Sequence, residues 1–238
     1  MKKVIFCFGC LISSIVFVHA QSPLDLLKKA TGSKSGDPSL STNEVVSGLK
    51  EALNTGVTKG TAKLSAVDGF FKDAALKILM PPEAQKVDKT LRSFGLGQQV
   101  DDAILAMNRA AEDAVKSAAP IFVTAIKQMS IDDAWGILKG GDAAATNYLR
   151  EKTTGSLTEA FKPVIDKSLE KTGATKYWNT AFTSYNKFSM KKINPDLSSY
   201  VTDKALTGIF TQVAMEEAKI RVDPMAQTTD LLKKVFGK

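Results

Sequence analysis

Beyond residue 40, apolar positions recur at steps of three and four along the chain, with polar residues between them. This spacing places apolar side chains on one face of a helix. The clearest stripe begins near Gln98, in the helix expected to be the longest, and consists of Val100, Ile104, Met107, Ala111, Ala114 and Ala118. The sequence has no alternating β-branched run and no Asn-Gly hairpin signal. The pattern therefore predicts an all-α fold, a single globular domain of roughly nine helices.

Start and stop signals divide this domain into its expected helices. Capping boxes, in which a serine precedes a glutamate by three residues, predict helix starts at Ser41 and Ser156. Asp68 is expected to cap a helix over 69–79, which the prolines at 81–82 would stop. The other expected helices cover 83–94, 98–118, 130–140, 176–190, 197–222 and 228–236, and Pro163 is expected to kink the helix that follows Ser156.

The first twenty residues have a different pattern. Lys2 and Lys3 precede an apolar run over 4–18, and small or branched residues then surround His19. This order is typical of a secretory signal peptide cleaved after Ala20. The run is shorter than the roughly 20 apolar residues that span a bilayer, although an uncleaved anchor is the structural alternative. We therefore expect a signal peptide over 1–20, a flexible Gly/Ser/Pro-rich linker over 21–40 and the helical domain over 41–238, in an exported, periplasmic protein that could associate with the envelope.

Sulfur and imidazole chemistry is confined to the predicted leader. Cys7, Cys10 and His19 are the two cysteines and the one histidine of the whole chain. Cys10 lacks the full preceding apolar region of a lipoprotein signal, so we do not expect it to be lipidated. After cleavage the mature chain would have no disulfide, no zinc site on Cys or His and no Ser-His-Asp triad. No cofactor and no metal site is expected.

Composition and charge narrow the class of protein further. Hydrophobic residues make up 44% of the chain, which is ordinary for a globular domain and far from disorder. Without Lys2 and Lys3 the chain has 30 basic residues (32 less 2) against 25 acidic ones, a net charge of +5. Such a modest excess favours solubility and some attraction to anionic surfaces, and predicts no specific nucleic-acid binding. No later apolar run is long enough to span a membrane.

Several stretches of the sequence resemble one bacterial family. These stretches are 68–70 (DGF), 107–112 (MNRAAE), 145–149 (ATNYL), 200–206 (YVTDKAL), 216–221 (EEAKIR) and 228–237 (TTDLLKKVFG). Together they resemble the exported bacterial family known as domain of unknown function 4197, over most of the chain after about Leu40. The resemblance implies an exported bacterial protein. It implies no activity, and therefore no catalytic or binding residue is taken from it.

Two groups of polar residues are candidates for acid–base chemistry. Asn108, Arg109 and Glu112 share one helix, where they could bind a polar ligand or form a surface ion ladder with Asn108 bonded to a neighbouring helix. Glu217 precedes Arg221 by one turn, which also fits a buried ion pair at a helix junction. If the protein is an enzyme, we expect a carboxylate-dependent hydrolase that uses Glu112 or Glu217.

The segment 171–195 is unusual because it has five lysines, five aromatic residues and no acidic residue. Basic residues between aromatic ones could contact an anionic lipid, a glycan or a phosphate backbone. The candidate binding residues are Lys176, Tyr177, Trp178, Lys187, Lys191 and Lys192, together with Asn108 and Arg109. Alternatively, Trp178, Phe182 and Tyr185 share one helical face and belong to the core, with the lysines as a solvated rim.

The leading hypothesis from these observations is a non-enzymatic binding or interaction protein of the cell envelope. Its partner would be an anionic envelope component or another protein. The alternatives are the hydrolase described above and a lipid carrier with an apolar cavity between its helices. The sequence makes no prediction about the oligomeric state.

Overall fold

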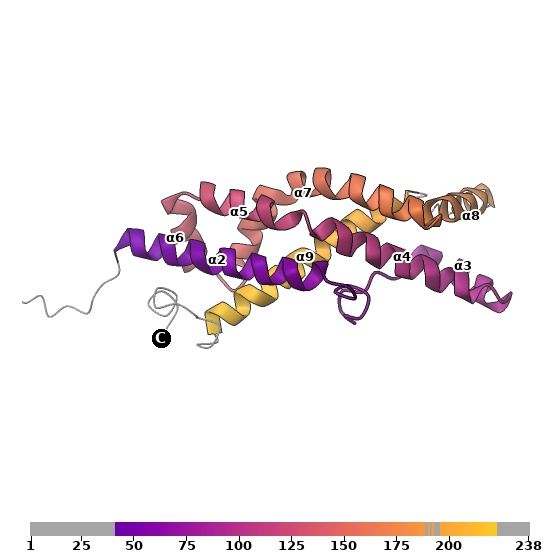
Figure 1. The fold of residues 1–238 in the computed structure, drawn as a ribbon, viewed down its shortest axis with the longest axis horizontal. Coiled ribbons are helices and arrows are strands. Elements are labelled where there is room, and N and C mark those ends of the chain that lie inside the picture. Colours follow the sequence, from indigo (N-terminus) through magenta and orange to yellow (C-terminus); the bar gives the residue numbers. More distant parts are fainter. Residues whose placement is uncertain (1–40, 189, 191, 193–195, 223–238) are drawn as a thin grey trace, which may run out of the picture. The chain divides into compact units, whose positions relative to one another are not determined.

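The computed structural model describes residues 41–188, 190, 192 and 196–222 of the chain. These ranges contain eight α-helices, one short 3-10 helix and no strand (Figure 1). The elements are α2 (Thr42–Ser65), η1 (Pro82–Ala84), α3 (Gln85–Ser93), α4 (Gly97–Val115), α5 (Ala118–Gln128), α6 (Ile131–Lys139), α7 (Ala144–Lys171), α8 (Ala174–Phe188) and α9 (Leu197–Val222). The all-α prediction is confirmed, with a helix count close to nine. The predicted leader, linker and 228–236 helix lie outside the described residues.

Local capping signals explain where several helices begin and end. In α2 the Ser41 hydroxyl accepts the Glu44 N–H at 3.2 Å, and the Glu44 carboxylate accepts the Ser41 N–H at 2.9 Å. Ser130 and Asp133 form the same reciprocal box at the start of α6. After α3, Gly95 has a φ of 79°, and this left-handed residue ends the helix as glycine commonly does.

The predicted helix over 69–79 is wrong, because these residues form a loop of turns. Ala66, directly after α2, is extended with a ψ of 156°, and Asp68 then has a φ of 69°, so the chain does not continue as a helix. A Cβ at Gly69 would lie 2.5 Å from the Lys63 carbonyl oxygen, which means that the loop folds back closely over the end of α2. The N–H groups of Phe70 and Phe71 then bind the Glu112 side chain instead of helical carbonyls.

Two other predicted boundaries are also wrong. The helix that starts near Gln98 ends at Val115, because Pro120 has no N–H to donate to the carbonyl of Lys116. Ala118 therefore belongs to the next helix, α5. The helix that starts near Gln98 is also not the longest helix, since α7 is longer. The predicted start at Ser156 lies inside α7, which begins at Ala144 and has 28 residues, including Pro163.

The core joins these helices around α7 and α9. The most extensive packing is of α7 against α4 and α9, and of α2 against α9. The largest side chains that are fully buried include Phe70, Phe122, Phe161, Phe210 and Met107. The rings of Phe122 on α5 and Phe210 on α9 meet edge to face with centroids 5.9 Å apart, a favourable aromatic geometry. None of the helices in the described ranges is long and apolar enough to cross a bilayer.

Candidate functional site

Asn108 on α4 binds the backbone of the loop over 66–81, which joins α2 to η1 and is called here the α2–α3 loop. The Asn108 Oδ1 atom accepts the N–H of Ile78 at 2.8 Å, and its Nδ2 atom donates to the carbonyl of the same residue at 2.8 Å. Nδ2 also donates to the Ile104 carbonyl at 2.7 Å. The side chain is fully buried, so its polar atoms are used to hold the loop.

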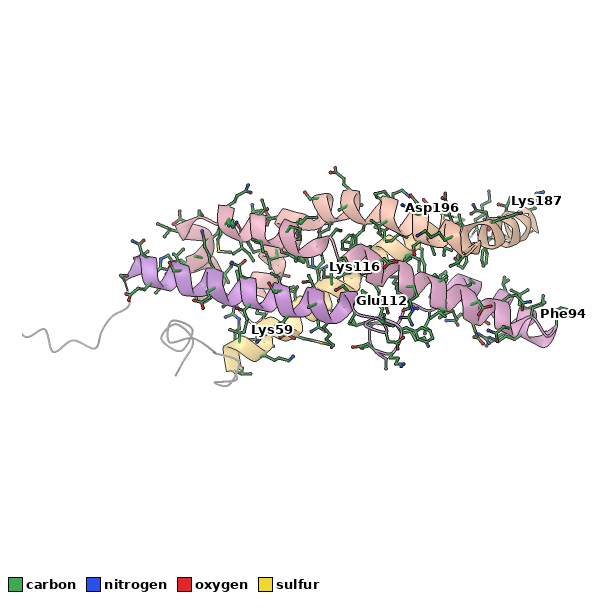
Figure 2. The ribbon with its side chains drawn as sticks, viewed as in Figure 1. Lys59, Phe94, Glu112, Lys116, Lys187 and Asp196 are labelled. Carbon is green, nitrogen blue, oxygen red and sulfur yellow. The ribbon has the colours of Figure 1, made fainter. Side chains whose placement is uncertain are left out.

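Glu112 holds the other end of the same loop and lies beside it on α4 (Figure 2). Its Oε1 atom accepts the N–H groups of Phe70 at 3.1 Å and Phe71 at 3.2 Å. Its Oε2 atom accepts from the Arg109 guanidinium at 2.6 Å, and Arg109 also donates to Asp68 at 2.6 Å. Both oxygens of this buried carboxylate are therefore occupied by donors of the protein itself.

Asp68 completes this network as a link to Lys72. The Lys72 ammonium lies 2.7 Å from Asp68 Oδ2, while the Arg109 guanidinium lies 2.6 Å from Oδ1. Hydrogen bonds from these two cations hold the pKa of Asp68 below its usual value. Hydrogen bonds to Glu112 and Asp68 raise the pKa of Arg109. Sequence reasoning assigned Asp68 to a helix cap and missed its role as the ion partner of Arg109.

Glu217 on α9 caps α7 from a distance in sequence. Its carboxylate accepts the N–H groups of Ala145 at 3.1 Å and Thr146 at 2.9 Å, and the Thr146 hydroxyl at 2.7 Å. The Arg221 guanidinium donates to the same carboxylate from Nε at 3.0 Å and from a terminal nitrogen at 2.8 Å. This is the buried Glu–Arg pair at a helix junction that the sequence offered as the structural interpretation. Its negative charge also suits the positive end of the α7 dipole.

The surroundings of the two glutamates give the hydrolase hypothesis no support. Acid–base hydrolysis needs carboxyl groups that face a substrate, whereas the oxygens of Glu112 and Glu217 are bonded to backbone N–H groups and arginines. A hollow beside Glu217, Ala145 and Arg221 measures only about 20 Å³. That volume is far below the roughly 300 Å³ at which small-molecule pockets begin.

The basic and aromatic residues of segment 171–195 separate in the structure. Trp178 and Phe182 on α8 are buried, and their ring centroids lie 4.2 Å apart. Lys176, Lys187 and Lys192 are exposed. The Tyr177 side chain and Lys191 lie outside what the structure describes. Asn108 and Arg109 belong to the α4 network and not to this segment.

One cleft in the described part of the protein was not predicted from the sequence. It lies between α5, the start of α6, and α7, and it has a volume of about 600 Å³. Its walls consist of Pro120, Ile121, Thr124, Ala125, Gln128, Asp133, Tyr148, Lys152, Thr153 and Ser156. Burial raises the pKa of Tyr148, and hydrogen bonds from Ser130 lower the pKa of Asp133. A sequence signal that could have pointed to this cleft is Tyr148, which belongs to the 145–149 stretch of the family resemblance.

Four of the six stretches that carry the family resemblance bind one another in two pairs. Stretch 68–70 is held by 107–112 through Arg109 and Glu112. Stretch 145–149 is held by 216–221 through Glu217. These residue patterns therefore fix the α2–α3 loop and the start of α7, which accounts for them as architecture.

Comparison with curated proteins found no match, and comparison with solved structures found none either. A family model described as Protein of unknown function (DUF4197) matches residues 39–237, which covers most of the chain. The chain therefore belongs to the DUF4197 family.

Proposed function

We propose that this protein is exported and acts in the cell envelope as a binding protein. We propose further that it attaches to an anionic component of the envelope, with anionic lipid as the first candidate. The observation that carries the proposal is the sorting of side chains along α8. Trp178 and Phe182 anchor the helix in the core, while Lys187 and the following Lys192 are exposed. Neither lysine forms an ion pair with a described residue, so their charge is available to an external anion.

The strength of such an attachment can be estimated from the charges. A lysine near an anionic bilayer contributes about 1 kcal/mol, and the contribution decreases with distance over a Debye length. Several lysines are therefore needed for appreciable binding, and segment 171–195 supplies five without an acidic residue among them. Binding of this kind weakens as salt is added, because the exposed charges are screened.

The geometry favours binding over the two alternatives. The glutamates that a hydrolase would use are bonded to donors of the protein. A lipid carrier needs a large apolar cavity, whereas the hollow between α2, α7 and α9 measures only about 20 Å³. The larger cleft beside α5 has a wall that includes Gln128, Asp133 and Lys152, so it is not apolar. Lys187 and Lys192 are exposed and have no such conflicting role.

Export is the second part of the proposal, and it rests on the sequence of residues 1–20. The paired lysines, the apolar run and the small or branched residues around His19 have the order of a cleaved leader. Expression of the full chain in a bacterium, followed by fractionation and mass spectrometry of the amino terminus, tests this. We expect a periplasmic or envelope form that begins at Gln21. A form that still contains Cys7 would contradict cleavage.

Vesicle sedimentation tests the attachment. The chain from Gln21 onward is mixed with vesicles of phosphatidylcholine alone or with a third of phosphatidylglycerol, at low and high salt. Lys187→Glu with Lys192→Glu should weaken binding to the anionic vesicles by about tenfold or more, since about 1 kcal/mol is lost for each removed lysine. The matched control is Lys59→Glu with Lys89→Glu, which changes the net charge equally on α2 and α3 (Lys59 and Lys187 are labelled in Figure 2).

The two double variants separate a local site from a general charge effect. Loss of binding in the α8 variant alone supports the proposal. Equal losses in both variants would show that only the net charge matters. Unchanged binding in the α8 variant, or equal binding to neutral vesicles, would overturn the proposed attachment.

A further inference from the structure

We propose that the cleft between α5, α6 and α7 binds a small zwitterionic ligand, an amino acid or a short peptide, with its ammonium group at Asp133 and its carboxylate at Lys152. This site includes neither Lys187 nor Lys192, and it does not depend on the proposed attachment to an anionic surface. The inference rests on the shape of the cleft, on its two opposite charges and on its remaining wall.

The cleft has the size of a small-molecule site. Its volume of about 600 Å³ lies within the range of roughly 300–1,000 Å³ that is usual for ligand pockets. The lining residues recur at three- and four-residue steps on α5 and on α7, so one face of each helix forms a wall. Small side chains, Ala125 on α5 and Thr153 on α7, are nearly buried there and leave space above them.

Two opposite charges line this cleft without pairing with each other. Asp133 uses Oδ2 to cap α6 through Ser130, and its Oδ1 atom accepts no hydrogen bond from a described residue. Lys152 donates a hydrogen bond to the carboxylate of its neighbour Glu151 at 3.2 Å, and this exposed ion pair is weak enough for a ligand carboxylate to replace. Asp133 and Lys152 nevertheless lie within electrostatic reach, because each stabilises the charged form of the other. A ligand with both charges can complement both groups at once.

The charge balance of the cleft also argues against other ligand classes. A ligand with only negative charges would be attracted by Lys152 and repelled by Asp133, and a purely cationic one would meet the reverse. Two like charges a few ångströms apart repel each other and weaken a complex. A zwitterion is the class that avoids both repulsions.

The rest of the wall suits the body of an amino-acid ligand. Pro120, Ile121 and Ala125 offer an apolar surface to a side chain. Gln128, with its amide, can donate to and accept from a peptide bond. The Tyr148 hydroxyl can do the same, because a tyrosine phenol is protonated at neutral pH and both donates and accepts. These groups could bind a residue of either a free amino acid or a peptide.

Isothermal titration of the chain from Gln21 onward tests the site with two probes, L-leucine and trialanine. Each probe is compared with its N-acetylated and its C-amidated form, which lack one charge. We expect one or both unmodified probes to bind, and each blocked form to bind at least tenfold more weakly. Binding of leucine alone identifies a free amino acid as the ligand class, and binding of trialanine alone identifies a peptide.

Two variants assign the charges to their partners. Asp133→Asn keeps an amide oxygen that can cap α6, and Lys152→Gln keeps most of the side-chain length. Each should weaken binding about tenfold. In addition, Asp133→Asn should remove the effect of N-acetylation, and Lys152→Gln should remove the effect of C-amidation. A variant that merely disturbed the fold would not produce this matched loss, and Asp132→Asn, on α6 but outside the cleft, serves as the control.

Either of two results with the wild-type protein would overturn the inference. Equal binding of blocked and unmodified probes to the wild-type protein would exclude recognition of the two charges. No binding of leucine or trialanine at about 10 mM, where a Kd of about 1 mM is readily detected, would exclude the site. Either result uses the wild-type chain and does not depend on the folding of a variant.

Discussion

The side-chain amide of Asn108 pairs with the backbone of Ile78 as another strand would, by accepting its N–H and donating to its carbonyl, each at 2.8 Å. The two residues are 30 positions apart, and both are buried. The α2–α3 loop has no helix to satisfy its backbone at this point, so α4 provides the partner. Asn108 is therefore a structural residue whose value can be measured as stability.

We expect Asn108→Ala to lower the free energy of unfolding by about 2–4 kcal/mol, because it leaves the N–H and the carbonyl of Ile78 buried without partners. Urea unfolding followed by circular dichroism measures this loss. The control is Gln99→Ala, an exposed position on the same helix, where a change of less than about 0.5 kcal/mol is expected. Equal effects at both positions would show that the loop is not held by Asn108.

Glu112→Gln tests whether the buried carboxylate is held by charge. The glutamine oxygen can still accept the N–H groups of Phe70 and Phe71, which share Oε1, but its NH₂ group cannot accept from the guanidinium of Arg109. Arg109 is about a third exposed and keeps Asp68 as a partner, so we expect a loss of about 1.5–3 kcal/mol in chemical unfolding, the value of a hydrogen bond to a charged group. Asp113→Asn on the next position, in an exposed pair with Lys116, should cost less than about 1 kcal/mol.

Acid sensitivity should decrease in Asp68→Asn. The folded pKa of Asp68 lies below the unfolded value of 3.8, so its contribution to stability is complete above that value and is lost as the pH falls through the folded pKa. Asparagine tolerates the φ of 69° at this position, and the backbone should therefore keep its turn.

Thermal melts from pH 7 down to pH 2 check this expectation. The difference in melting temperature between the wild type and Asp68→Asn should be largest near neutral pH and should shrink below about pH 4. Other aspartates with lowered pKa values, such as Asp101 and Asp196, are present in both proteins and cancel in the difference. A difference that stays constant with pH would exclude the charge of Asp68 as its cause.

Local signals in the sequence predicted much of the fold. The start of α2 is fixed by Ser41 and Glu44, three residues apart, and the bounds of α9 at Leu197 and Val222 coincide with the predicted ones. Such signals are readable because the donor and the acceptor lie within one turn. The burial of Trp178 agrees with its place on an apolar helical face.

Contacts between distant residues explain what the sequence did not predict. The start of α7 is capped by Glu217, 71 positions after Thr146, so no local pattern marks it. The backbone of the α2–α3 loop is satisfied by α4, which removes the need for a helix after Asp68. The α5–α7 cleft arises where small residues of two helices face each other, and this depends on the packing of the helices.

Gly208 on α9 provides the last test, because it makes room for Phe70 of the α2–α3 loop. A Cβ at Gly208 would lie 2.4 Å from the Phe70 ring, which is fully buried. We expect the ring to shift and Gly208→Ala to cost about 1–3 kcal/mol of packing energy, partly offset by about 1 kcal/mol of helix propensity. Gly155→Ala on α7, where an added Cβ meets no atom within 4 Å, should instead stabilise the protein by up to about 1 kcal/mol.

A double-mutant cycle identifies Phe70 as the cause of this cost. Phe70→Leu shortens the side chain, so Gly208→Ala should be less destabilising in that background than in the wild type, and unfolding by urea measures both differences. The coupling would show that the close approach of α9 and the loop requires glycine at this position. If Gly208→Ala costs the same in both backgrounds, the contact with Phe70 does not account for the glycine, and the loop is held by the α4 residues alone.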